Sequence, residues 1–116
     1  MIEGKKPPLF IGTSGFSYPA WRGSFYPDKM PAREFLTHYS SRFRSLEVNS
    51  TFYRLPLVST LSRWYDLTPE GFVFAVKASR YITHIKRLGE PETTVVPFLE
   101  RVRFLGTKLG PILLQL

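Results

Sequence analysis

The sequence predicts an α/β fold in which four strand–helix repeats form one domain. Short apolar runs of strand-like composition alternate with segments whose apolar residues recur at helical spacing. No two runs are joined by the short turn of a β-hairpin, so we expect parallel strands with right-handed crossovers. The 116 residues suffice for one hydrophobic core and are too few for two, so the domain is expected to span residues 1–116.

The first repeat is predicted to begin with a strand at Leu9–Thr13, an apolar run between prolines and a Ser-Gly turn. Residues 1–8 are expected to form a flexible N-terminal tail. A long loop at 14–30 carries glycines and prolines. Pro31 suits the first turn of a helix. The apolar face of that helix is predicted to contain Phe35, Leu36, Tyr39 and Phe43.

The second repeat starts at Ser45–Asn49, where polar and apolar residues alternate with the period of a strand. Its helix is predicted from Leu57 onward. Leu57, Leu61 and Trp64 follow one helical face. The segment 68–71 is expected to end this helix, because proline lacks an amide donor and glycine permits a turn.

The third repeat begins with Phe72–Lys77, a run rich in aromatic and β-branched residues that predicts a strand. A long loop at 78–93 follows. The third helix is predicted from about Thr94, with Leu99, Val102 and Leu105 on its apolar face and Gly106 or Gly110 at its end. Pro111–Leu116 is predicted to be the fourth strand.

Two architectures fit this order of elements, an open doubly wound sheet and the front half of a TIM (β/α)8 barrel. The first strand is not followed by the glycine-rich fingerprint of dinucleotide-binding sheets. Strands covered by helices on both faces are apolar on both, yet Ser45, Glu47 and Asn49 share one face of the second strand. These polar positions favour a barrel-type fold, of which the chain covers about the first four β/α units.

Polar side chains are predicted to converge at the C-terminal ends of the strands, where barrel enzymes keep their sites. The set comprises Thr13, Glu47, Asn49, Lys77 and Gln115. Glu47 is the candidate general base or metal ligand, and Lys77 the candidate anion holder or the cation that lowers the pKa of the acid. The alternative is a buried Glu–Lys ion pair that serves only the fold.

Two loops add candidate binding residues. The first holds five aromatic residues within eleven positions, and these either stack on a base or sugar or simply pack the loop: Phe16, Tyr18, Trp21, Phe25 and Tyr26. The second is cationic and hydroxyl-bearing, as phosphate sites are, through Arg80, Tyr81, Thr83, His84, Lys86 and Arg87. His84 is either an acid/base catalyst or merely solvated. His38, inside the first helix, is expected to be structural. Little in the sequence supports a protein-only metal site, and the sequence leaves the metal requirement and any cofactor undetermined.

Composition narrows the classes of function. The 16 Lys and Arg against 9 Asp and Glu give a net charge of +7, which favours anionic small molecules or nucleic acid as partners. These charges are spread over loops and helices rather than gathered in one stripe. The absence of cysteine excludes disulfides and thiol catalysis within this chain. No apolar run approaches the roughly 20 residues of a membrane-spanning helix. A cytoplasmic protein without membrane contact is expected.

Four motifs resemble those of the YecE-like family, domain of unknown function 72: GTSGFSYPAWRGSFYP (12–27), SLEVNSTFYRLP (45–56), FAVKASRYITH (74–84) and LGTKLGPILLQL (105–116). The resemblance implies a TIM barrel with no assigned activity. Phe16 stands where members of the family often carry Trp. The positions that match the motifs include Gly12, Thr13, Ser14, Trp21, Tyr26, Glu47, Asn49, Thr51, Phe52, Tyr53, Lys77, Thr83, His84, Lys108, Gly110 and Gln115.

The chain is too short for the fold that this resemblance implies, because a TIM barrel typically needs about 250 residues and this sequence has 116. A half barrel would leave its first and fourth strands as unpaired edges. We therefore expect a fragment or truncated gene product whose missing C-terminal half completes the barrel. Self-association of two half barrels is the alternative.

The leading functional hypothesis is an enzyme, or its inactive front half, that acts on a phosphorylated or nucleic-acid-like anion. Glu47, Lys77 and His84 are the catalytic candidates. The substrate-binding candidates are Thr13, Ser14, Tyr18, Trp21, Asn49, Thr51, Tyr53, Arg80, Thr83, Lys86 and Gln115. The alternatives are a non-catalytic nucleic-acid-binding module and a remnant without activity. The sequence does not decide between an enzyme and a binding protein, and it names no reaction.

Overall fold

Four parallel strands form one sheet in the computed structural model, which describes residues 9–48, 57–78 and 95–114. The strands are β1 (Gly12–Ser14), β2 (Ser45–Val48), β3 (Val73–Lys77) and β4 (Leu109–Leu113). They lie side by side in the order β1-β2-β3-β4, the order in which they follow along the chain. The predicted α/β class with a parallel sheet is therefore confirmed.

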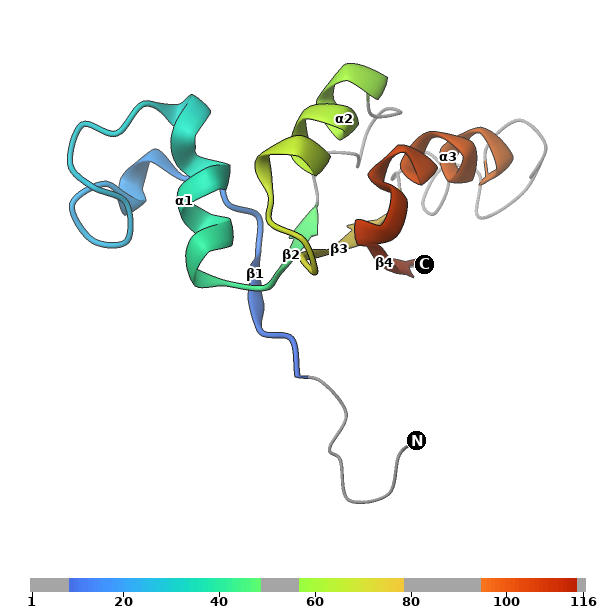
Figure 1. The fold of residues 1–116 in the computed structure, drawn as a ribbon, viewed down its shortest axis with the longest axis horizontal. Helices are drawn as coiled ribbons and strands as arrows, with labels where there is room; N and C mark the ends of the chain where they lie inside the picture. Colours follow the sequence, from blue (N-terminus) through green and yellow to red (C-terminus); the bar gives the residue numbers. More distant parts are fainter. Residues whose placement is uncertain (1–8, 49–56, 79–94, 115–116) are drawn as a thin grey trace.

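Helices connect consecutive strands and cover one face of this sheet (Figure 1). The α-helices are α1 (Phe35–Arg42), α2 (Val58–Leu67) and α3 (Val95–Val102). Short 3-10 turns are η1 (Pro19–Trp21), η2 (Ala32–Glu34) and η4 (Arg103–Lys108). None of the described helices is long and apolar enough to cross a membrane.

The core lies between the sheet and the helices. In β2 and β3 every second side chain is fully buried, namely Leu46, Val48, Phe74 and Val76. Because side chains alternate across a strand, this spacing places all four on the helix-covered face. Phe35, Leu36 and Tyr39 of α1 complete the same cluster with Leu61, Phe98, Val102 and Leu105.

Aromatic rings fill much of this layer. Tyr26, from the loop after β1, stacks on Phe35 with ring centroids 4.1 Å apart. Trp64 of α2 stacks on Phe74 of β3 at 6.0 Å. The rings thereby attach the loop to α1 and α2 to the sheet, which accounts for the hydrophobic pattern that the sequence shows at these positions.

The bounds of the two outer strands differ from the prediction. β1 begins at Gly12 rather than Leu9, because its partner β2 begins at Ser45 and pairs Gly12 first. Leu9 and Ile11 precede the ladder and are 74% and 63% exposed. β4 begins at Leu109, two residues before the predicted Pro111. Apolar composition marked both segments correctly, whereas pairing decided where the strands begin.

Two apolar helix positions also point away from the core, contrary to prediction. Leu57 precedes α2 and is 63% exposed, and Leu99 of α3 is 40% exposed. In α3 the buried pair is Phe98 and Val102, which are spaced by four residues and so lie on one helical face. The predicted end of α2 is confirmed, with Thr68 as its C-terminal cap.

Candidate functional site

Glu47 and Lys77, two of the polar residues that the sequence singled out, lie on the face of the sheet that none of the described helices covers. The register aligns Ser14 with Glu47 and Glu47 with Ala75, so these three residues form one row across β1, β2 and β3. Lys77 follows Ala75 by two positions and lies on the same face, beside Leu113 of β4. This row lies at the C-terminal ends of the strands, where parallel α/β proteins bind ligands.

Glu47 and Lys77 are the two charged groups of this row. Both belong to adjacent strands and share the face opposite the helices. Both are half-buried, so water reaches each of them in this chain. The alternative of a Glu–Lys ion pair that serves only the fold stays a prediction beside that of a binding site. An accessible carboxylate and ammonium on neighbouring strands are able to hold an anionic ligand and exchange its proton.

Thr13 does not join this row, although convergence with Glu47 was expected. It pairs with Leu46 and faces the helices. Its Oγ1 donates to the carbonyl of Gly15 at 2.7 Å and lies 3.1 Å from the Tyr39 hydroxyl. Tyr39 accepts the Thr13 amide at 2.7 Å and donates to the Ser45 carbonyl at 2.8 Å. Thr13 therefore helps to join β1, β2 and α1, and Ser14 is the residue of β1 on the open face.

The aromatic loop after β1 is mostly packed. Phe16, Trp21 and Phe25 lie against the core, and Tyr26 is buried. Trp21 contacts the rings of Tyr18 at 4.6 Å and of Tyr26 at 5.8 Å. Of the two predictions for this loop, packing describes these four residues best.

Tyr18 is the exception in that loop, because 41% of it is exposed. Its hydroxyl donates to the Ser14 carbonyl at 2.6 Å, which brings the ring back over the end of β1. The ring crowds Gly15, whose positive φ of 83° supplies the turn that makes this return. Tyr18 is thus held at the end of β1, with its ring packed against that of Trp21.

The remaining predicted site residues lie outside the described part of the chain. These are Asn49, Thr51, Tyr53, Arg80, Thr83, His84, Lys86 and Gln115. Their convergence with Glu47 and Lys77 stays a prediction. Within the described residues, no group of three or more His, Cys, Asp or Glu side chains is placed to hold a metal ion.

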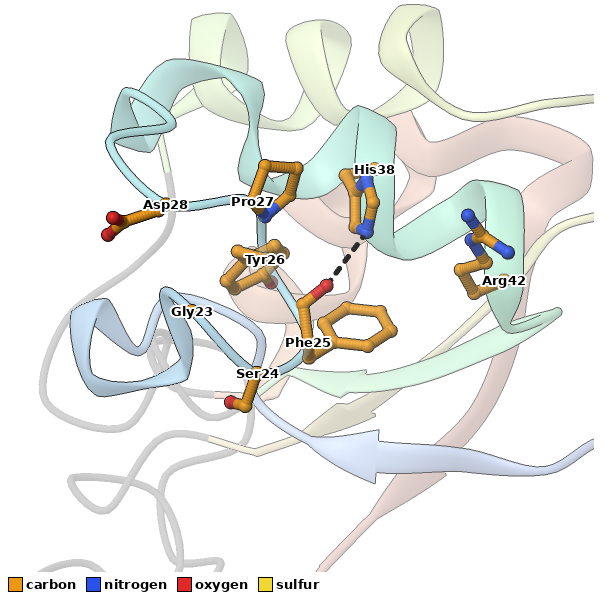
Figure 2. Close-up of a pocket in the computed structure, with 8 residues that line it drawn as sticks. All are labelled: Gly23, Ser24, Phe25, Tyr26, Pro27, Asp28, His38 and Arg42. Atoms are coloured by element: carbon orange, nitrogen blue, oxygen red, sulfur yellow. Dashed lines mark hydrogen bonds between the residues drawn. The ribbon is translucent and has the colours of Figure 1, made fainter.

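A groove of about 610 Å³ lies on the outer side of α1, against the loop at 23–28 (Figure 2). His38 and Arg42 line it from the helix, and Ser24 and Asp28 line it from the loop. Figure 2 shows the contact that sets its shape, between His38 Nε2 and the carbonyl of Phe25 at 3.0 Å. His38 fastens the loop to the helix, in agreement with its predicted structural role.

Tyr26 forms the inner wall of this groove without offering it a polar group. Its hydroxyl donates to the Phe16 carbonyl at 2.5 Å. Burial, with a smaller contribution from the neighbouring Tyr39, raises the pKa of Tyr26 to about 12. The phenol therefore stays neutral and serves as a buried hydrogen-bond donor.

Lys108 is a residue whose role the sequence did not predict. It is almost fully buried, and its Nζ donates to the carbonyls of Tyr65 at 2.5 Å and Thr68 at 2.7 Å. Those carbonyls close the C-terminus of α2, where a cation is favoured by the helix dipole. The ammonium also lies 4.1 Å from the centre of the Tyr65 ring. Lys108 thus attaches η4 to α2, and its motif match reflects a structural function.

Sequence comparison finds longer relatives. The profile of a family described as "Protein of unknown function DUF72" matches residues 10–116. The UPF0759 protein YecE of Escherichia coli (strain K12) is 30% identical over 108 residues, which make up 93% of this chain and 37% of that protein. The UPF0759 protein YunF of Bacillus subtilis (strain 168) is 33% identical over 79 residues, 68% of this chain and 27% of that protein.

Solved structures agree with this match. A crystal structure of a DUF72 family protein (TM1631) from Thermotoga maritima aligns with a TM-score of 0.77 at 31% identity, over 91% of this chain and 43% of that one. One of a DUF72 family protein (EF0366) from Enterococcus faecalis aligns with a TM-score of 0.61 at 26% identity, over 69% of this chain and 34% of that one. The chain spans less than half the length of each of these relatives.

Proposed function

The chain belongs to the DUF72 family, and on that premise we propose that it is the front half of a TIM (β/α)8 barrel whose site lies at the C-terminal strand ends. The consecutive order of four parallel strands supports this proposal, because a barrel adds its strands in chain order. The single helix layer supports it too, since the uncovered face would become the barrel interior.

The function that we propose is catalysis on a phosphorylated or nucleic-acid-like anion. The observation that carries it is the placement of Glu47 and Lys77 on one accessible face of adjacent strands. In this proposal Lys77 holds the anion and Glu47 transfers the proton. Ser14 and Tyr18 line the wall on the β1 side. Trp21 acts through Tyr18 rather than by contact with the ligand.

Residues beyond the described ranges extend this proposal on sequence grounds alone. Arg80, Thr83 and Lys86 would add phosphate-binding groups, and His84 a second acid/base group. Asn49, Thr51, Tyr53 and Gln115 would line the remaining strand ends. We place the protein in the cytoplasm on the same grounds.

Completion of the barrel needs a partner for both sheet edges. In the described part of the chain, β1 pairs only with β2 and β4 only with β3. We propose that a C-terminal half, such as the additional length of the relatives provides, covers these edges and the open face. A second copy of this chain is the alternative partner. The intact mass of the polypeptide from its natural source distinguishes the two, because a mass well above 13.4 kDa requires the longer protein.

The test of the enzymatic proposal is a ligand screen on the longest natural polypeptide that contains this chain. Sugar phosphates, nucleotides and short oligonucleotides are screened for a rise in melting temperature, which reports binding to the folded state. Hits are then assayed for turnover. We expect Lys77→Ala to abolish the rise, and Glu47→Gln to keep binding while turnover is lost. If every hit raises the melting temperature of both variants as much as that of the wild type, the ligand does not bind at Glu47 and Lys77, and the proposal is wrong.

The alternative function is nucleic-acid binding without catalysis, which the net charge of +7 and the exposed Tyr18 ring favour. Binding through phosphates weakens linearly with the logarithm of salt concentration. A steep slope together with an absence of turnover would support this alternative, and salt-insensitive binding would reject it. A chain with neither binding nor turnover would be an inactive remnant.

A further inference from the structure

A second groove lies between α1 and α2, on the helix-covered side of the sheet. Its volume is about 360 Å³, within the range of roughly 300–1,000 Å³ typical of small-molecule sites. The turn η2 and helix α1 form one wall, α2 the other, and the loop after β1 closes one end. Trp64 in its wall stacks on Phe74, so the groove and the row of Glu47 and Lys77 lie on opposite faces of the sheet.

The floor of this groove is apolar and rigid. Leu36 is 2% exposed, and Trp64 and Phe16 meet edge to face with ring centroids 6.4 Å apart. Because Trp64 also stacks on the buried Phe74, its orientation is fixed by the core. A flat apolar group therefore has a preformed surface to pack against.

The rim of the groove is cationic. Arg33 reaches it from η2 and Arg63 from α2, and Ser17 and Thr60 add hydroxyl groups. No Asp or Glu is among the described residues that line it. Two guanidinium groups without a carboxylate favour an anion, and their planar donors suit phosphate. Both arginines are exposed, so binding an anion costs them little desolvation.

We propose that this groove binds a small phosphate monoester with a flat, apolar body. The phosphate lies between Arg33 and Arg63, and the body packs on the floor beside Trp64. A long peptide or a duplex exceeds a groove of this volume. This site is additional to the one proposed at the strand ends. In the alternative that the test below must exclude, Arg33 and Arg63 bind no ligand, and their aliphatic stems only cover apolar surface.

The test uses phenyl phosphate as the probe, with phenol and inorganic phosphate as its two halves. Binding to the longest natural polypeptide that contains this chain is followed by NMR, through the indole N–H of Trp64 and the Nε–H groups of Arg33 and Arg63. We expect saturable binding of phenyl phosphate and at least about tenfold weaker binding of either half. Arg33→Gln/Arg63→Gln should lower the affinity by about tenfold or more.

The matched control is Arg42→Gln/Arg103→Gln, which removes the same charge at exposed positions outside the groove. This variant should bind within about twofold of the wild type if the effect is local. Equal weakening of both double variants, or no saturable binding to the wild type, overturns the proposal. Loss of binding in Lys77→Ala with full binding in Arg33→Gln/Arg63→Gln also overturns it, and would instead support the site at the strand ends.

Discussion

At the scale of single residues, three buried polar side chains hold the elements together. Tyr39 links β1 and β2 through its hydroxyl, Lys108 closes the end of α2, and Tyr26 fastens the loop after β1. Each bonds backbone groups that are at least partly buried, and an unsatisfied buried group costs about 1–3 kcal/mol. The sequence marked Tyr39 as apolar core and did not predict its hydrogen bonds, because the partners are backbone atoms that only the fold brings near.

Removal of the Tyr39 hydroxyl is expected to destabilise the protein. Tyr39→Phe keeps the ring but leaves the Thr13 amide and the Ser45 carbonyl without this partner. We expect the free energy of unfolding to fall by about 1–3 kcal/mol in urea titrations. Tyr65→Phe is the control, because Tyr65 lies at the surface, and it should change stability by less than about 0.5 kcal/mol. Equal effects of the two variants would contradict the role of Tyr39.

Replacement of Lys108 tests whether its buried charge is structural. Lys108→Met keeps much of the side-chain volume but leaves the carbonyls of Tyr65 and Thr68 without the ammonium. We expect a loss of about 1–3 kcal/mol in the free energy of unfolding. Arg103→Met, at an exposed position of the same turn, should stay within about 0.5 kcal/mol of the wild type. A neutral Lys108→Met would contradict the structural role of this charge.

Tyr26 makes stability depend on pH in the alkaline range. Its pKa is about 12 in the folded chain against 10.0 for an ordinary tyrosine, so above pH 10 the unfolded chain loses its proton first. The contribution of Tyr26 is therefore full below pH 10 and is lost as the pH rises towards 12. Urea titrations of wild type and Tyr26→Phe, compared at pH 8 and pH 11, isolate this group. The difference in the free energy of unfolding between wild type and Tyr26→Phe should be smaller at pH 11 than at pH 8. An equal difference at the two pH values would contradict the raised pKa of Tyr26.

At the scale of elements, the pairing of strands depends on glycines that admit close approach. Gly110 of β4 lies where a Cβ would collide with the Val73 side chain and come within 3.1 Å of the Phe74 carbonyl. The register of β3 and β4 shifts at this place. The sequence placed Gly110 at the end of a helix, since a glycine there looks like a stop signal. Gly110 instead allows β4 to approach β3 closely. This role depends on Val73, which lies 37 positions before Gly110 in the sequence.

Gly110→Ala is expected to disturb the β3–β4 pairing. Crowding of the added methyl group should cost about 1–3 kcal/mol in the free energy of unfolding. Gly23→Ala provides the comparison, because its positive φ strains the backbone while nothing lies within 4 Å of the new Cβ. That strain alone should cost about 1 kcal/mol. Amide exchange of Phe74 and Val76 should rise in Gly110→Ala only, and unchanged exchange there would contradict the packing argument.

At the scale of the whole molecule, the described helices cover one face of the sheet and leave the other face open among the described residues. Leu113 lies on the open face beside Lys77 and is 47% exposed, and Leu114 after it is 48% exposed. Apolar residues next to an unpaired strand edge favour association with another sheet. The same feature underlies the proposed completion of a barrel, by a C-terminal half or by a second copy.

The isolated 116-residue chain should therefore associate as its concentration rises. Sedimentation velocity over roughly a hundredfold range of concentration should show the weight-average mass increase. Leu113→Lys should suppress this increase, because a charge on the open face opposes sheet-to-sheet contact. Leu99→Lys, at an exposed apolar position on α3, is the matched control and should associate like the wild type. A wild-type monomer at all concentrations would show that the open face needs no partner.

The sequence by itself determined the α/β class, the parallel strands, the shared face of Glu47 in β2 and Lys77 in β3, and the family. Hydrophobic periodicity and the spacing of glycines and prolines are local properties, so they can be recognised without a fold. Only the tertiary structure decided that Thr13 faces Tyr39, that β1 begins at Gly12, and that Lys108 closes α2. Each of these features depends on a residue that is distant in the sequence. Strand register and burial bring that residue near, and the local sequence pattern carries no information about such contacts.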